Sequence, residues 1–352
     1  MVEKRFYAAR SADQKGAAVT LQQEKPARKP RLRRINCNGP GITRRRYGKG
    51  YSYRAADGSK ITDAETVERI NQLAIPPAWR NVWISPVPNG HIQATGIDDA
   101  GRRQYIYHPR WRELKDREKF DRALDFGDAL PKARPAITRI LRSEGPSEQR
   151  AYAAAFRLIE DAGLRIGNEE YAQTNGSFGV TTIQIRHLRV RGSVIELDFP
   201  AKSGQQWTGN IEDPDLAEAL RPLLKNRGPD EQVLGYFDDD GEFTPISSAG
   251  LNDFIREQCG EDFTAKDFRT WQGTVAAAIA LAAHPPEHSS PTARKKAVAA
   301  AMRDVAEHLG NTATIARKSY VDPRIIDRFM NGETIDANTY RAAERSLREL
   351  VT

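Results

Sequence analysis

A tyrosine and three cations in the carboxy-terminal part of the chain have residue types and surroundings that suit phosphoryl transfer. Tyr320 follows Arg-Lys-Ser and precedes Val-Asp-Pro, and a proline at that place must end or kink a helix. Arg165 lies between two predicted helices, Arg269 lies near the start of an alanine-rich helix, and Lys202 lies in an Ala-Lys-Ser-Gly turn. Taken singly, each is typical of a helix-end aromatic or a surface cation.

Together, these side chains suit the attack of a tyrosine on a phosphodiester. The five-coordinate transition state carries extra negative charge on its non-bridging oxygens, and guanidinium groups stabilise that charge through paired hydrogen bonds. The departing sugar oxygen needs a proton, which a lysine of lowered pKa can supply. Covalent capture by tyrosine conserves the bond energy, so resealing needs no ATP. Because cations stabilise the charge, no metal is required either.

Several other kinds of site are missing from the sequence. It contains no Gly-rich Lys-Ser/Thr loop for nucleotide phosphates, no dinucleotide fingerprint and no His-Glu-x-x-His zinc helix. Cys37 and Cys259 are too few and too far apart to indicate a disulfide framework or a zinc site. No apolar run approaches the roughly 18 residues that a membrane span needs, and the first residues contain no apolar signal-peptide core. These features favour a soluble intracellular protein.

Basic residues are concentrated at the amino terminus. Residues 1–46 hold 13 Lys and Arg against 3 Asp and Glu, whereas the remaining 306 residues hold 41 and 44. Residues 1–33 have little periodic apolar content, so we expect a basic disordered arm. Such an arm is typical of a nucleic-acid contact, although it also suits a solubilising tail. We expect folded structure to begin around Ile42.

The pattern of elements predicts an α+β protein with a two-lobed architecture. A small, mainly antiparallel β domain is expected over 34–117, and a larger, mostly helical domain with a β insertion at about 181–210 over 118–352. Strands are predicted at 47–53, 82–85, 91–95, 104–107, 181–185, 188–190, 194–199 and 206–210. A helix is predicted from Thr62 or Asp63 to Pro76, and further helices at 148–162, 167–175, 215–225, 248–258, 265–283, 291–309, 325–330 and 338–350.

The chain resembles the type IB DNA topoisomerases of the small, poxvirus-like kind found in bacteria. The resemblance covers nearly all of residues 42–335 and rests on several motifs in one order. These are 76–79 (PPAW), 90–96 (GHIQATG), 101–108 (GRRQYIYH), 163–171 (GLRIGNEEY), 181–187 (TTIQIRH), 202–204 (KSG), 266–274 (KDFRTWQGT) and 318–321 (KSYV). So many ordered matches make a chance likeness implausible.

The resemblance implies a role for each site residue. Tyr320 matches the nucleophile that forms a 3′-phosphotyrosyl link and leaves a free 5′-hydroxyl. Arg165 and Arg269 match the arginines that stabilise the transition state, and Lys202 matches the general acid that protonates the leaving oxygen. Three further residues match those of the amino-terminal domain that touch bases and backbone in the major groove: Gln104, Tyr105 and Tyr107. A glutamine also suits bidentate bonding to an adenine edge.

Two positions depart from the family pattern. The family usually has a histidine nine residues before the tyrosine, and here that residue is Asn311. An asparagine amide can donate a neutral hydrogen bond to a phosphate oxygen but cannot be cationic. We expect Asn311 to make this contact, and we do not expect His308, nearly a helical turn earlier, to replace it. Ala201 stands where a glycine usually precedes the lysine, which leaves the turn geometry at Lys202 open.

The resemblance implies a monomeric enzyme that clamps duplex DNA between its two domains. It would cleave one strand, let the free end rotate, and reseal it, relaxing positive and negative supercoils with no ATP and no metal, in the cytoplasm at the nucleoid. A tyrosine recombinase is an alternative, since it shares the chemistry. However, recombinases usually have His-x-x-Arg at the second arginine, where this chain has Lys-Asp-Phe-Arg. A non-catalytic duplex-DNA-binding protein is a further alternative, favoured only by the missing histidine.

Overall fold

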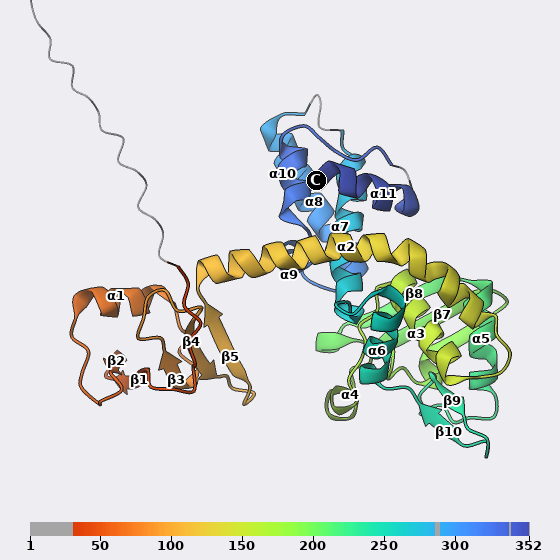
Figure 1. Cartoon of the computed structure of the whole chain (residues 1–352), viewed down its shortest axis with the longest axis horizontal. Coiled ribbons are helices and arrows are strands. Elements are labelled where there is room, and N and C mark those ends of the chain that lie inside the picture. The colour runs from red at the N-terminus through yellow and green to blue at the C-terminus, as the bar shows by residue number, and fades with distance from the viewer. Residues whose placement is uncertain (1–30, 286–288, 338, 352) are drawn as a thin grey trace, which may run out of the picture. The chain divides into compact units, whose positions relative to one another are not determined.

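The computed structural model describes residues 31–285, 289–337 and 339–351 and divides the chain into two compact units, Met1–Glu113 and Leu114–Thr352 (Figure 1). Most of the predicted basic arm, residues 1–30, lies outside the described residues. The first strand of the chain begins at Ile42, where folded structure was expected to begin, and an isolated contact precedes it. Arg33 already forms a β-bridge with Gly90, and its backbone N–H donates to the carbonyl of Asn89.

The amino-terminal unit contains a five-stranded antiparallel sheet in the order β2-β1-β3-β4-β5. The strands are β1 (Ile42–Tyr47), β2 (Gly50–Arg54), β3 (Arg80–Ile84), β4 (Ile92–Ile97) and β5 (Arg103–Tyr107). The prediction of one strand over 47–53 is wrong, because the chain reverses there. Gly48 has a φ of +57°, which glycine adopts at little cost, and β1 and β2 pair as a hairpin around it.

Helix α1 (Ala64–Gln72) packs against this sheet to form the core of the unit. It begins at Asp63, as predicted, and the Asp63 carboxylate accepts a hydrogen bond from the backbone N–H of Thr66. Ile70 is the buried residue of the helix. The other buried apolar residues of this core come from the strands: Ile42, Tyr53, Val82, Ile84 and Ala94.

Helices dominate the carboxy-terminal unit, which has one continuous hydrophobic core. The predicted helices at 148–162, 265–283 and 291–309 are confirmed as α3 (Glu148–Ala162), α7 (Ala265–Ala282) and α8 (Pro291–Leu309). α2 (Pro109–Leu141) runs through the predicted domain boundary at 117 and contains two prolines. The other helices are α4 (Glu169–Asn175), α5 (Pro214–Leu224), α6 (Ser248–Cys259), α9 (Ala313–Ser319), α10 (Pro323–Met330) and α11 (Tyr340–Val351).

A three-stranded sheet, β6-β7-β8, forms the predicted β insertion of this unit. Its strands are β6 (Leu188–Arg191), β7 (Val194–Pro200) and β8 (Gln206–Glu212). The predicted strand at 181–185 is wrong. The backbone there turns, since the N–H groups of Thr182 and Ile183 both donate to the carbonyl of Gly179. A short 3-10 helix, Ile185–His187, follows, and β9 (Gly235–Phe237) and β10 (Phe243–Pro245) form a separate hairpin.

These elements confirm the α+β fold: an antiparallel β unit precedes a mostly helical one. No helix within the described part of the chain is long and apolar enough to cross a membrane. Within the same residues, no group of three or more His, Cys, Asp or Glu side chains is arranged to hold a metal ion.

Candidate active site

Tyr320 lies at the junction of two short helices, as the proline downstream predicts. It is the C-cap residue of α9, and its backbone N–H donates to the carbonyl of Ala316 over 3.0 Å. Pro323 opens α10, where Asp322 is the N-cap. The Tyr320 side chain is half-buried, and the guanidinium carbon of Arg269 lies 5.1 Å from the centre of its ring. The tyrosine is therefore fixed by a helix end on both sides and faces a cation.

Gly273 and Thr274 of α7 hold the backbone of Tyr320 in place. A Cβ on Gly273 would lie 2.9 Å from both the Cβ and the carbonyl oxygen of Tyr320, so only glycine permits this close approach. The Thr274 hydroxyl donates to that carbonyl over 3.0 Å and accepts from the backbone N–H of Asp322 over 3.2 Å. Sequence reasoning did not assign these residues a role, although the Gly-Thr pair closes the Arg269 motif and could have suggested one.

Arg269 is buried in the first turns of α7, with only 5% of its surface exposed. The helix begins with a capping box between Thr264 and Asp267, which fixes its start. One terminal nitrogen of Arg269 donates to the carbonyl of Gly163, and the other donates to the carbonyl of Leu309 over 2.6 Å. These bonds to rigid backbone set the orientation of the guanidinium.

Arg165 lies in the loop after α3, about 100 residues before Arg269 in the sequence. α3 ends at Gly163, which has a left-handed φ of +60°, and this reversal directs the chain into the site. The Arg165 carbonyl accepts from the backbone N–H of Val180. Its guanidinium donates to the side-chain oxygen of Asn311 over 2.9 Å and to the carbonyl of Gly310 over 3.3 Å. The structure therefore brings Arg165 and Asn311 into direct contact.

The two arginines create a site that lacks negative charge. Within the described residues, no carboxylate forms an ion pair with Arg165 or Arg269. Burial, and then the charge of Arg269, lower the pKa of Arg165 to about 10. Burial also lowers the pKa of Arg269, while Tyr320 acts in the opposite direction. Neighbouring cations that are buried or half-buried and have no counter-ion favour the binding of an anion such as a phosphate.

The same cations act on the Tyr320 hydroxyl. Burial alone would raise its pKa, but Arg269, followed by Arg165 and Lys202, more than offsets this effect. The pKa of Tyr320 therefore lies below its ordinary value of 10.0. A lowered pKa makes the phenolate, which is the attacking form of a tyrosine, easier to reach.

Asn311 uses both ends of its amide within the protein. Its side-chain oxygen accepts from Arg165, and its side-chain nitrogen donates to the carbonyl of Leu309 over 3.2 Å. The backbone of Asn311 is fixed by a bond from its N–H to the carbonyl of Ala306. In this arrangement Asn311 holds the guanidinium of Arg165, and its side-chain amide carries one further N–H.

Lys202 lies at the tip of the β7–β8 hairpin, in the 3-10 turn Lys202–Gly204. The turn is closed by a bond from the N–H of Ala201 to the carbonyl of Gln205 over 2.7 Å. The side chain is exposed, and its charge reaches Tyr320, whose pKa it lowers. Ala201 takes extended dihedral angles, φ −98° and ψ −172°, which need no glycine. The alanine that replaces the usual glycine therefore fits the turn before Lys202 without backbone strain.

The predicted DNA-binding residues lie on strand β5 of the amino-terminal unit. Tyr105 and Tyr107 are exposed, and their rings stack with centres 5.9 Å apart. The guanidinium carbon of Arg103 lies 5.6 Å from the Tyr105 ring centre. Gln104 lies between Arg103 and Tyr105 in the sequence, so its side chain points to the other face of the strand. Its amide donates to the carboxylate of Asp98 over 2.9 Å. The two tyrosines and Gln104 therefore lie on opposite faces of β5.

Comparison with known proteins identifies the class to which this fold and site belong. Residues 108–344 match the family model of the eukaryotic DNA topoisomerase I catalytic core, and residues 50–98 match that of the bacterial DNA topoisomerase IB N-terminal domain. The chain is 32% identical over 297 residues to DNA topoisomerase 1B of Acanthamoeba polyphaga mimivirus, covering 83% of this chain and 88% of that protein.

Two more distant relatives carry related names. DNA topoisomerase 1B of vaccinia virus (strain Copenhagen) is 21% identical over 246 residues, which cover 68% of this chain and 73% of the viral protein. DNA topoisomerase 1 of Mycosarcoma maydis is 23% identical over 222 residues, but the match spans 22% of that protein. The chain belongs to the type IB DNA topoisomerase family, and the resemblance inferred from its motifs is confirmed. It is an enzyme of the isomerase class.

Proposed function

We propose that this protein relaxes positive and negative supercoils by cleaving one DNA strand through a 3′-phosphotyrosyl intermediate at Tyr320, letting the free end rotate, and resealing it. The observation that carries the proposal is the grouping of Tyr320 with two guanidinium groups, the buried Arg269 and the half-buried Arg165, that have no acidic partner among the described residues. Lys202 is close enough to influence the same hydroxyl.

The proposed cleavage step uses each residue for one task. The Tyr320 hydroxyl loses its proton to solvent, and its oxygen forms a bond to phosphorus as the bond from phosphorus to the 5′ oxygen breaks. Arg165 and Arg269 stabilise the charge on the non-bridging oxygens, with Asn311 holding Arg165 and offering an N–H. Lys202 gives a proton to the leaving 5′ oxygen. Resealing is the reverse step: the 5′-hydroxyl attacks, its proton returns to Lys202, and tyrosine leaves.

This chemistry requires neither ATP nor a metal ion. The phosphotyrosyl bond retains the energy of the phosphodiester, so the reverse reaction needs no energy source. Lewis-acid stabilisation of the phosphate is one role that metal ions play in other phosphoryl-transfer enzymes. In this site the same charge is supplied by Arg165 and Arg269, whose orientations are set by bonds to backbone carbonyls and to Asn311.

We propose duplex DNA as the substrate and a single chain as the working form, located at the nucleoid. The stacked pair Tyr105 and Tyr107, with Arg103 beside it, offers aromatic and cationic groups on an exposed strand, which suit nucleic-acid contact. A base contact through the Gln104 N–H that donates to Asp98 requires that bond to break, whereas the amide also carries a second N–H and a carbonyl oxygen. Substitution of Asp98 by Asn would weaken that internal bond and thereby test whether Gln104 changes partners.

The test is relaxation of supercoiled plasmids of either sign by purified protein in EDTA without ATP. Wild-type protein should relax both, and Tyr320→Phe should relax neither and form no denaturation-resistant adduct. Tyr236→Phe in the β9–β10 hairpin is the matched control and should remain active. A requirement for magnesium, or activity in Tyr320→Phe, would refute the proposal. Failure of wild-type protein to form any adduct would favour a non-catalytic DNA-binding protein. Synapsis of two duplexes would favour a recombinase.

A further inference from the structure

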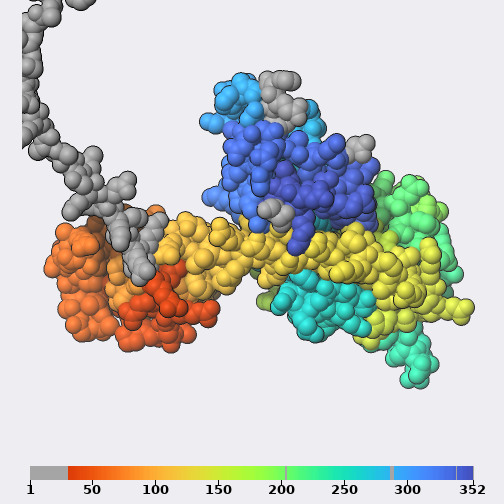
Figure 2. Space-filling model, turned by 45° about the horizontal axis from the view of Figure 1, so that its top comes forward, coloured from red at the N-terminus to blue at the C-terminus, as the bar shows by residue number. Residues whose placement is uncertain are grey.

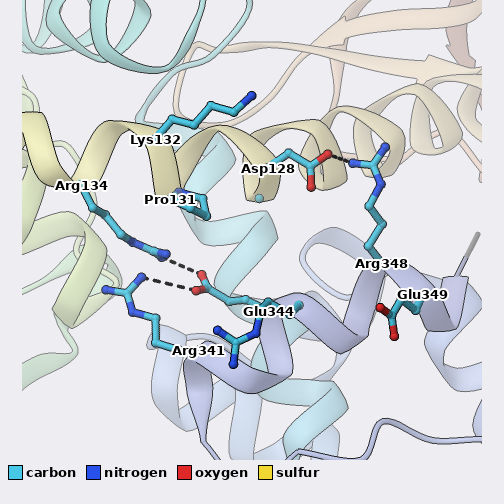
Figure 3. A pocket seen from close by; sticks show the side chains of 10 residues that line it. Asp128, Pro131, Lys132, Arg134, Arg341, Glu344, Arg348 and Glu349 are labelled. Carbon is cyan, nitrogen blue, oxygen red and sulfur yellow. Dashed lines mark hydrogen bonds and ion pairs between the residues drawn. The ribbon is translucent and has the colours of Figure 1, made fainter.

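A charged pocket lies between helices α2 and α11 of the carboxy-terminal unit. Its volume is about 1030 Å³, and its lining includes Asp128, Arg134, Arg341, Glu344 and Arg348. Many of its charged groups pair with one another across the two helices. Arg134 of α2 and Arg341 of α11 both point toward Glu344, while Arg348 reaches Asp128 (Figure 3). The pocket wall is therefore an ion-pair network that joins α2 to α11.

Glu344 is the centre of this network. It has 8% of its surface exposed, and one carboxylate oxygen accepts both from Arg134 over 2.7 Å and from the indole N–H of Trp271 over 2.9 Å. Arg134 also pairs with Glu160 at the end of α3. A buried carboxylate with several donors fixes the groups around it, because losing a donor leaves charge uncompensated. Glu344 thus ties α11 to α2 and, through Trp271, to α7.

Trp271 lies two residues after Arg269 on α7. Two residues correspond to about 200° of rotation around a helix, so the two side chains leave α7 on nearly opposite sides. On the Trp271 side the fit is close, because a Cβ on Gly127 of α2 would lie 2.5 Å from the indole ring. Figure 2 shows the blue carboxy-terminal atoms packed against the yellow surface of α2. α7 is consequently held from behind by α2 and α11 while Arg269 faces the site.

The neighbouring residue Gln272 extends this support to the other arginine. Its amide nitrogen donates to the carbonyls of Ile159 and Glu160 in the last turn of α3. That turn leads into Gly163, whose carbonyl accepts from Arg269, and then into Arg165. A rotation or shift of α7 would therefore move Arg269 directly and would disturb the segment that carries Arg165.

We propose that Arg134, Glu344 and Trp271 form a positioning set, the α11 brace, which holds Arg269 in the orientation that stabilises the transition state. This inference rests on the function proposed above and extends it to residues that do not touch the substrate. A guanidinium must meet the phosphate oxygens at hydrogen-bond distance, and a misplacement of about 1 Å can cost on the order of 10²-fold in rate. The brace acts mainly through Arg269, so most of its contribution is lost when that side chain is absent.

The experiment is a double-mutant cycle on single-turnover cleavage of a suicide DNA substrate, which accumulates adduct irreversibly so that slow variants are measurable. Trp271→Phe keeps the ring and removes the N–H donor to Glu344. In the wild-type background it should slow cleavage about 10-fold and leave DNA affinity unchanged. This loss is smaller than the roughly 10²-fold that a full misplacement of about 1 Å can cause. In an Arg269→Ala background the same substitution should change the rate less than 2-fold, because coupled residues are not additive.

Two further variants separate positioning from general loss of stability. Glu344→Gln retains an oxygen that can accept the indole N–H while removing the charge that Arg134 pairs with, so it serves even if Trp271→Phe folds poorly. It should slow cleavage in the same direction, again mainly when Arg269 is present. Asp128→Asn is the control. It weakens the adjacent α2–α11 ion pair with Arg348 without touching α7, and its cleavage rate should equal that of the wild type.

Each outcome decides one question. Equal slowing by Trp271→Phe or Glu344→Gln with and without Arg269 would overturn the α11 brace, as would equal slowing by Asp128→Asn. If wild-type protein forms adduct, the proposed function stands whatever the cycle gives. If wild-type protein forms none, the proposed function fails, and the brace fails with it.

Discussion

Arg269 and Lys202 of the candidate active site are held in very different ways. Arg269 is 5% exposed and bonds to two backbone carbonyls, whereas Lys202 is exposed at a hairpin tip and has no hydrogen-bond partner among the residues described. The difference matches the two proposed tasks. Charge stabilisation gains from rigid groups that need no reorganisation, while a proton donor needs access to an oxygen that departs.

The contrast between Arg269 and Lys202 predicts that Arg269→Ala causes the largest loss of cleavage rate. Losing one transition-state donor costs about 10²–10³-fold in rate, and this guanidinium supplies charge and more than one donor. We therefore expect single-turnover cleavage to fall by more than about 10³-fold. Arg150→Ala is the matched control, since Arg150 is also buried and also bonds two backbone carbonyls, those of Leu141 and Gly145. Arg150→Ala should lower the melting temperature but leave cleavage below that temperature nearly unchanged; equal losses would contradict the proposed role.

The next effect is that of Lys202→Ala. General-acid catalysis contributes about 10²–10⁴-fold, and we expect a loss of about 10³-fold on an ordinary substrate. A 5′-thio substrate, whose leaving group needs little protonation, should restore the rate of Lys202→Ala but not that of Arg269→Ala. Lys225→Ala, which replaces the C-cap lysine of α5, should behave as wild type on both substrates. Without rescue by the thio substrate, Lys202 would not be the acid.

Asn311→Ala should have a smaller effect, about 10²-fold, at the lower end of the cost of losing one oxyanion donor. The structure gives this residue an additional task, because its side-chain oxygen holds Arg165. The losses of Asn311→Ala and Arg165→Ala should therefore combine to less than their product, and this can be measured in the same cleavage assay. A full multiplicative loss would mean that Asn311 acts independently of Arg165, and no loss would make it a bystander.

The smallest expected effect is a shift in the pH dependence of cleavage. On the 5′-thio substrate, cleavage should rise with pH as the Tyr320 hydroxyl loses its proton, with an inflection below pH 10, because its pKa lies below the ordinary value. Removing either Arg165 or Lys202 takes away a charge that lowers this pKa, so the inflection moves to higher pH. Arg165→Ala should move it further than Lys202→Ala, because Arg165 has the larger influence. The reverse order would contradict the arrangement described.

Local patterns in the sequence were sufficient to predict many of the helices and strands, but the 33-residue helix α2 was not among them. The caps at Asp63 and Gly163, and the alanine-rich runs, define α1, α3 and α7. Two predicted strands were wrong because a single glycine or a single turn reverses the backbone there. The hairpin at Gly48 interrupts a continuous apolar-polar alternation, and the turn at Thr182 replaces a strand in a β-branched run. Such local reversals depend on contacts that periodicity does not contain.

The candidate site residues were predicted from motif and chemistry, but their connections were not. That Tyr320, Arg165 and Arg269 meet follows only from the packing of α7, α9 and the loop after α3. Neither the bond between Asn311 and Arg165 nor the opposite placement of Gln104 and Tyr105 on β5 was foreseen. Each depends on a partner distant in sequence or on a choice of face, which residue type alone does not specify.

The hydroxyl of Thr274 has a mechanical consequence for the proposed intermediate. A rotating DNA strand joined to Tyr320 would exert tension on the backbone at that residue. This hydroxyl bonds the Tyr320 carbonyl and the N–H of Asp322, so the load passes into α7, an 18-residue helix with most of its side chains buried, and not along α9 and α10 alone. Because α7 also carries Arg269, the anchor and the stabilising charge belong to one rigid body. Torque would then displace both together, and the attacking geometry for resealing would be retained.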